Sequence, residues 1–148
     1  DINYPSLTRA QFAPIWAFAN KQQGQYGTFT YQPPIYKDTS GTATGTLLVN
    51  NAGGYAAGSS TIATDGLTGT LKAGDFIKFA GHDKVYTITA DGSTSLAIEP
   101  ALLESVADNE VITYNDVPFT MAFTTDTQEM SVSTGGFVAY QIKLVEVV

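Results

Sequence analysis

The sequence of 148 residues contains no cysteine, a single histidine and few charged residues. Without cysteine there are no disulfides, thiolate metal sites or cysteine nucleophiles. Lys and Arg total only 7 and are scattered along the chain, so there is no basic patch for nucleic-acid phosphates. No apolar run approaches the roughly 18 residues of a membrane-spanning helix. We therefore expect no direct nucleic-acid binding and no membrane insertion.

Charged residues make up 14% of the chain, and the formal net charge is −7. Hydrophobic residues at 43% and aromatic residues at 11% are enough for a folded core. The polar surface must then be built mostly from Thr, Ser, Gln, Asn and Gly. Such a surface suits long-lived contact with other proteins because few ions have to be desolvated. An ordinary acidic β-domain with a neutral surface fits the composition equally well.

The middle of the chain is a series of short strand patterns. Runs rich in Val, Ile, Thr, Tyr and Phe predict strands, and the turns between them contain Ala80-Gly81-His82-Asp83 and Ala90-Asp91-Gly92-Ser93. So few short strands must close into a small barrel or pack on a second sheet to cover their edges. The predicted strands are 76–79, 84–89, 96–98 and 111–114.

The N-terminal segment predicts an amphipathic helix. Thr8 and Gln11 have the spacing of a capping box, and Gly24 is placed to end the helix. Pro14 falls inside it and predicts either a kink or a helix that begins later. The apolar stripe consists of Phe12, Ile15, Trp16 and Ala19.

The C-terminal segment alternates between apolar and polar residues over 117–123 and again over 138–144. Two such patterns predict a long hairpin joined by the polar loop Thr125–Gly136. The apolar phase shifts by one at 145–148, which predicts a bulge or burial on both faces. We expect the core of this part of the protein to be anchored by Phe12, Trp16, Phe119 and Tyr140.

Two loops have few apolar anchors and many glycine or small polar residues, 50–60 and 125–136. The first is either a flexible loop or one that becomes ordered only against a neighbour, since Gly-rich segments lose the most entropy on ordering. We place a candidate protein–protein interface on these loops. Its residues are Asn50, Gly53, Gly54, Tyr55, Gly58, Thr125, Gln128, Gly135 and Gly136.

The sequence offers little catalytic chemistry. His82 lies in a Gly-His-Asp turn and is expected on the surface, and no nucleophile-elbow, phosphate-loop or paired-histidine motif is present. We therefore predict no catalytic residue, no metal site and no cofactor. Asp65, Asp75, Asp83 and Asp91 fit turn positions or a weak calcium site, and Glu99, Glu104, Asp108 and Glu110 could supply the carboxylate pair of a glycosidase. Tyr4, Tyr26, Tyr36 and Tyr55 fit sugar stacking or a subunit interface.

Three stretches in collinear order resemble the tail-tip and distal-tail group of tailed-bacteriophage tail proteins. They cover about half of the chain, and the order is more specific than any single motif. The resemblance also implies a strand pair ahead of the helix, where this sequence has only Asp1–Leu7. The stretches are RAQFAPIWAFANKQQGQYGTFTYQPP at 9–34, LKAGDFIKFAGHDKVY at 71–86, and AIEPALLESVADNE at 97–110 with VPF at 117–119.

The resemblance implies a structural protein of the virion tail that acts in a tail-tip, collar or baseplate ring, in contact with other tail proteins. The implied fold is mainly β with one N-terminal helix: an antiparallel β-sandwich body, 1–37 and 117–148, with a small β-barrel inserted at 38–116. We also consider a carbohydrate- or receptor-binding β-domain, motivated by the loop aromatics. A small hydrolase with paired carboxylates is the third hypothesis.

Overall fold

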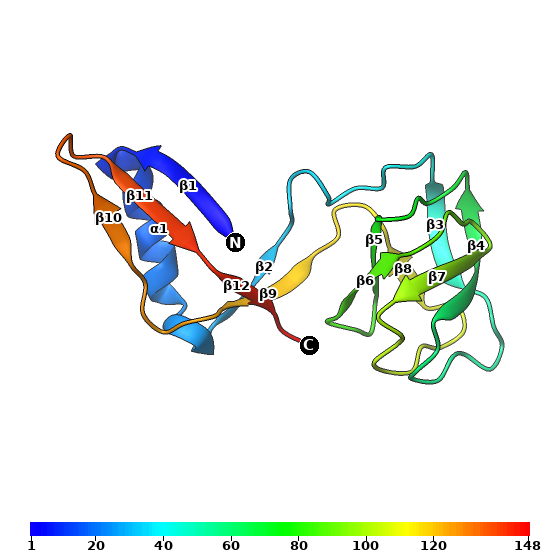
Figure 1. Ribbon diagram of the computed structural model, residues 1–148. Helices are drawn as coiled ribbons and strands as arrows, with labels where there is room; N and C mark the ends of the chain where they lie inside the picture. Colours follow the sequence, from blue (N-terminus) through cyan, green and yellow to red (C-terminus); the bar gives the residue numbers. More distant parts are fainter. The chain divides into compact units, whose positions relative to one another are not determined.

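The computed structural model describes all residues, Asp1–Val148, and divides into two compact units. The first unit consists of Asp1–Thr30 and Thr120–Val147, and the second of Tyr31–Phe119 together with Val148. The chain has one α-helix, and strands make up most of the remaining regular structure. Figure 1 shows these elements along the chain. The second unit contains a closed antiparallel barrel. The predicted class, mainly β with one N-terminal helix and a small β-barrel, is confirmed.

The first unit is built from the two ends of the chain. Its strands form two three-stranded sheets, in the orders β1-β11-β10 and β12-β9-β2. The paired strands run antiparallel in β1–β11, β10–β11 and β9–β12. The elements are β1 (Ile2–Leu7), α1 (Arg9–Lys21), the 3-10 turn η1 (Gly24–Tyr26), β2 (Thr28–Tyr31), β9 (Phe119–Phe123), β10 (Met130–Val132), β11 (Val138–Ile142) and β12 (Leu144–Glu146).

The capping box at the start of α1 is present. The backbone N–H of Thr8 donates to Oε1 of Gln11 at 3.0 Å, and the backbone N–H of Gln11 donates to Oγ1 of Thr8 at 3.4 Å. The helix therefore begins at Arg9 and includes Pro14, so the alternative of a later start is wrong. Gln23 and Gly24, with φ of 55° and 68°, reverse the chain just after it.

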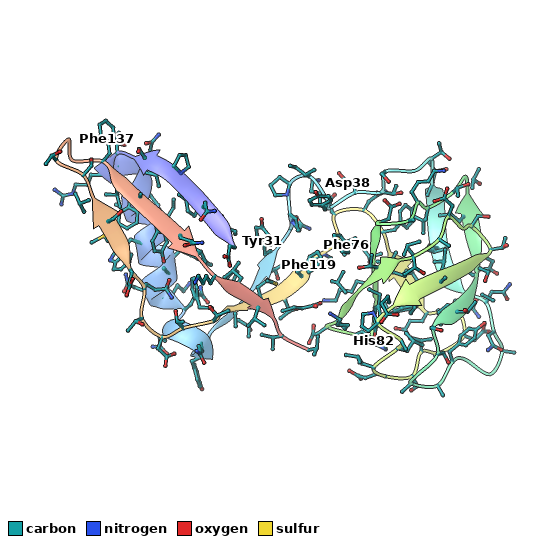
Figure 2. All side chains as sticks on the ribbon, viewed as in Figure 1. Tyr31, Asp38, Phe76, His82, Phe119 and Phe137 are labelled. Carbon is teal, nitrogen blue, oxygen red and sulfur yellow. The ribbon has the colours of Figure 1, made fainter.

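The apolar stripe of α1 packs on the sheet β1-β11-β10. Phe12 and Tyr140 are buried, and their ring centroids are 5.5 Å apart in an edge-to-face arrangement. Trp16 is half-buried and lies 5.9 Å from the same tyrosine ring. Phe119 is also half-buried but belongs to the second unit, where its ring meets Phe76 edge-on at 5.2 Å (Figure 2).

The predicted long hairpin is wrong in its pairing. β9 pairs with β12, with Phe123 opposite Leu144, while β11 pairs with β1 and β10. The polar loop 125–136 itself contains β10, which forms the real hairpin with β11. The reason lies at Lys143, where the chain leaves one sheet and enters the other. The shift in apolar phase at 145–148 marks this change of sheet.

The second unit is a barrel of six strands in the order β3-β4-β7-β6-β5-β8, closed by pairing of β8 with β3. Strands β5, β6, β7 and β8 coincide within two residues at each end with the runs predicted from their Val, Ile, Tyr and Phe content. Alternate residues point inward, and Leu47, Ile77, Phe79 and Leu96 have no exposed surface. The strands are β3 (Thr44–Val49), β4 (Thr61–Thr68), β5 (Phe76–Phe79), β6 (Val85–Ile88), β7 (Ser95–Glu99) and β8 (Val111–Thr113).

The two chain segments that lead into and out of the barrel are joined to each other. The backbone N–H of Val117 donates to the carbonyl of Lys37 at 3.0 Å, and that of Asp116 donates to Oδ1 of Asp38 at 2.9 Å. The Lys37 ammonium also binds the carboxylates of Asp116 and Asp38. Hydrogen bonds to Asp116 and then to Asp38 raise the pKa of Lys37, and the Asp116 N–H lowers that of Asp38. These exposed ion pairs contribute little alone, but the hydrogen bonds from the Val117 and Asp116 N–H groups bring the barrel ends together.

Candidate functional site

Of the candidate interface residues at 50–60, Asn50, Gly53 and Gly58 are exposed, whereas Gly54 and Tyr55 are half-buried. The loop has its own partners within the barrel. Tyr55 exchanges two backbone hydrogen bonds with Val106, both 2.9 Å, and its Oη accepts the N–H of Ala63 at 2.9 Å. A neighbour is therefore not needed to order this loop. Its place in an interface stays a prediction supported by exposure rather than by disorder.

The second candidate loop lies in the first unit. Thr125, Gly135 and Gly136 are exposed, and Gly136 has φ of 75° at the tip of the β10–β11 hairpin. Gln128 is half-buried instead. Its Oε1 accepts a hydrogen bond of 2.8 Å from Oη of Tyr140, and its Nε2 donates to the carbonyl of Thr125 at 3.1 Å. Gln128 thus ties the loop to the core.

A shallow groove of about 570 Å³ lies beside this loop. Its lining is mainly uncharged and polar, with Glu129 and Lys143 as the only charged side chains. Residues from β1, β10, β11 and the segment ahead of β10 contribute to it. The uncharged polar members are Asn3, Thr125, Thr127, Gln128, Ser131 and Gln141.

His82 is buried, with only 4% of its surface exposed, so the expected surface position is wrong. Its Nδ1 lies 2.9 Å from Oη of Tyr86, and its Nε2 lies 3.5 Å from the carbonyl of Ser105. The same tyrosine oxygen accepts the N–H of Leu103 at 3.2 Å. The histidine and tyrosine together hold the segment after β7 against the barrel. The only feature of the sequence that could have predicted this contact is the spacing of His82 and Tyr86, which lie four positions apart on either side of a turn.

Asp75 is also buried and acts as the acceptor for the segment that leads into β3. It accepts hydrogen bonds from the side chains of Thr39 and Ser40 and from the backbone N–H of Ser40 and Lys72, the last two at 2.8 Å. Burial alone raises the pKa of Asp75, but these hydrogen bonds outweigh it and hold the pKa below its usual value. The carboxylate therefore stays ionised and holds the segment that leads into β3 against the turn at Lys72.

The other carboxylates considered for metal or glycosidase chemistry are spread over strands and separate turns; Asp65 lies in β4, so its expected turn position is wrong, and Glu99 ends β7. Glu110 accepts the backbone N–H of Gly81 at 2.8 Å and of Ala107 at 3.0 Å, and Asp108 accepts that of Asn51 at 2.9 Å. Hydrogen bonds from Lys72 and the Ala73 backbone lower the pKa of Asp91. Their geometry is that of turn stabilisation. No group of three or more His, Asp or Glu side chains lies close enough to hold a metal ion.

The four tyrosines considered for sugar stacking divide into two pairs. Tyr4 stacks beside Tyr140 with centroids 6.3 Å apart, and Tyr55 is bonded into the barrel. Tyr26 and Tyr36 are 87% and 62% exposed, but they belong to different units. Among these four tyrosines, neither unit therefore presents an exposed pair.

The second unit is thus a closed antiparallel β-barrel whose two chain ends are joined by hydrogen bonds from the Val117 and Asp116 N–H groups. Residues 38–117 match the family model described as "Distal tail protein pb9, B domain". Because this match covers more than half of the 148 residues, the chain belongs to that family. None of the curated proteins matches the chain.

The family assigns the protein to the tail of a bacteriophage virion, as a structural protein that contacts other tail proteins. The resemblance to phage distal-tail proteins is confirmed; the matched residues include the stretches at 71–86 and 97–110, whereas the stretch at 9–34 lies outside them. None of the protein's helices has the length and apolarity that crossing a membrane requires.

Proposed function

We propose that this protein acts without catalysis, as a subunit of a ring in the tail tip, collar or baseplate. The observation that carries the proposal is the family match over the barrel. The outer strands of the two three-stranded sheets support it, since sheet edges are sites at which a neighbour can pair. Cyclic symmetry with heterologous contacts would build a closed ring from identical subunits.

The net charge of −7 is compatible with a ring through which DNA passes. Excess acid repels phosphates over about a Debye length, so such a ring would not retain the nucleic acid. Carbohydrate binding is not proposed, because the exposed tyrosines do not form a shared platform within either unit.

The interface prediction is tested by hydrogen exchange. We expect residues 50–60 and 125–136 to exchange faster in free protein than in assembled tails, because an interface of about 800 Å² per partner removes both loops from solvent. Mass photometry of the purified protein reports the oligomer, and mass spectrometry of virions reports its presence in the particle. A strictly monomeric protein that is absent from tails would contradict the proposed function. Equal exchange in both states would instead move the interface away from these loops.

We also propose that the barrel, 38–116, is an insertion that folds independently of the body, 1–37 and 117–148. The hydrogen bonds that join Lys37 to Val117 and Asp38 to Asp116 support this, because they close the barrel at its two chain ends. A fragment of residues 37–117 should unfold cooperatively, with dispersed amide resonances in its NMR spectrum. The matched deletion of 39–114 should leave a soluble body, since loop closure costs grow slowly with length. An unfolded fragment or an aggregated deletion would show that the two parts depend on each other.

A further inference from the structure

Strand β10 is an unprotected outer edge of the sheet β1-β11-β10. Its residues Met130, Ser131 and Val132 are all exposed, and the two apolar side chains are 48% and 62% exposed. The N–H of Ser133 donates to the carbonyl of Phe137 at 2.9 Å. Antiparallel alternation then directs the N–H and C=O of Ser131 toward β11, and those of Met130 and Val132 away from it.

The opposite edge of the same sheet is protected. β1 carries Pro5, which lacks a donor, and its register with β11 shifts between Tyr4 and Leu7. β10 has neither a proline nor a charged residue. Proteins usually protect free edges by such devices because an open edge pairs with other chains. Within this sheet, β10 rather than β1 is therefore the edge open to pairing with another chain.

The groove beside β10 restricts what can cover it. Met130 and Ser131 belong to its lining, so the groove is continuous with the open edge. Its single glutamate and single lysine balance in charge, and the other polar lining groups are hydroxyls and amides. These groups suit an uncharged segment that offers hydrogen bonds, because hydroxyls and amides make up most of the polar lining and its two opposite charges favour neither sign of charge.

The size of the edge selects the kind of partner. At about 3.3 Å per residue, a three-residue strand is only about 10 Å long. Edge-to-edge contact with a second folded copy along this length would bury far less than the roughly 800 Å² per partner of a stable interface. An extended arm can pair with β10 and also continue into the groove, so it buries more surface from the same edge.

We propose that β10 and its groove bind an extended, uncharged arm of another tail protein, which adds to the sheet as a fourth strand. This inference rests on the proposed function in the tail. The arm pairs with the outward N–H and C=O groups of Met130 and Val132, and its hydroxyl or amide side chains enter the groove. Phe137, 47% exposed beside the hairpin tip, extends the apolar contact (Figure 2).

The test is the full-length variant Val132→Pro, with Val132→Thr as its matched control. Proline at 132 removes only an outward N–H, so the β10–β11 pairing and the melting temperature should stay as in the parent protein. We expect at least a tenfold loss of copies per virion for the proline variant and normal incorporation for the threonine variant, counted by quantitative mass spectrometry. A photocrosslinker at Ser131 in virions should link to a terminal segment of a different tail protein.

The outcomes separate this inference from the proposed function. If the parent protein itself is absent from virions, the function in the tail is wrong. If the proline variant folds and is incorporated at the parent level, strand addition at β10 is wrong while the tail function stands. If the proline variant is lost but the crosslink joins two copies of this chain, the partner is a second copy and the proposed arm is wrong. If the proline variant melts far below its parent, hydrogen exchange of the parent protein decides: unchanged exchange of Met130 and Val132 between free protein and virions overturns the proposal.

Discussion

Replacing Asp75 with alanine is expected to destabilise the barrel by about 3–4 kcal/mol. The change removes the buried acceptor of Ser40 and Lys72 and leaves their N–H groups without a partner. Hydrogen bonds to a buried charged group are worth more than neutral ones, and orphaned buried donors add a desolvation cost. Urea unfolding at pH 7, followed by circular dichroism, measures the change. The control is Asp65→Ala on the exposed side of β4, which should change stability by less than about 0.5 kcal/mol.

The effect of Asp75 also has a defined pH dependence. The pKa of this carboxyl is lower in the folded protein than its usual value of 3.8. Its stabilisation is therefore fully present above the unfolded pKa and is lost as pH falls through the lower, folded pKa. The difference in unfolding free energy between the parent protein and Asp75→Ala should stay constant from pH 7 to about pH 5 and shrink below about pH 4. A difference below 1 kcal/mol at pH 7 would show that the segment around Thr39 and Ser40 does not depend on the carboxylate.

Replacing Gly66 with alanine is the second change expected to have a large effect, about 3 kcal/mol or more. Gly66 has φ of 76°, and a Cβ there would overlap the backbone carbonyl oxygen of Thr46 on the neighbouring strand β3. The strands cross closely at this point, where the register shifts between Gly45 and Leu48. Neither backbone can withdraw without opening the pairing of β3 with β4.

The matched control for this prediction is Gly58→Ala. Gly58 also has a positive φ, 91°, but a Cβ there meets no atom within 4 Å. Its substitution should cost only the conformational term, about 1–2 kcal/mol. Thermal unfolding of the two variants separates backbone strain from steric overlap. Equal losses in the two variants would mean that β3 and β4 can move apart at no cost.

Four of the six strands of the barrel, β5 to β8, were predictable because their signals are local, whereas β3 and β4 were not predicted. The runs around Ile77, Tyr86 and Ile112 carry β-branched and aromatic residues between turn residues, and these preferences act whatever the rest of the chain does. The cap of α1 was predictable for the same reason, since Thr8 and Gln11 satisfy each other within one turn. β1 was missed because Pro5 interrupts its alternating pattern.

Strand pairing could not be read from the same patterns. The alternation in β9 and β11 states which residues face a core, but it does not state which strand lies alongside. Because the chain passes from one sheet to the other at Lys143, β9 pairs with β12 and β11 pairs with β1, instead of β9 pairing with β11. Pairing depends on contacts between residues far apart in the sequence, such as Ile2 with Ile142.

By itself, the sequence determined the class of the protein: short β-strands, one capped helix, a surface with few charges and an ordered series of motifs typical of phage tail proteins. The tertiary structure alone decided the roles of individual polar residues. His82 and Asp75 both stand in turn-like sequence contexts, yet both are buried, because folding of the barrel places the segment 103–105 beside His82 and Tyr86 and the segment 39–40 beside Asp75. The tertiary structure also decided which sheet edges lack a neighbouring strand. Burial and edge exposure depend on what the rest of the chain places next to a residue, and no local pattern contains that information.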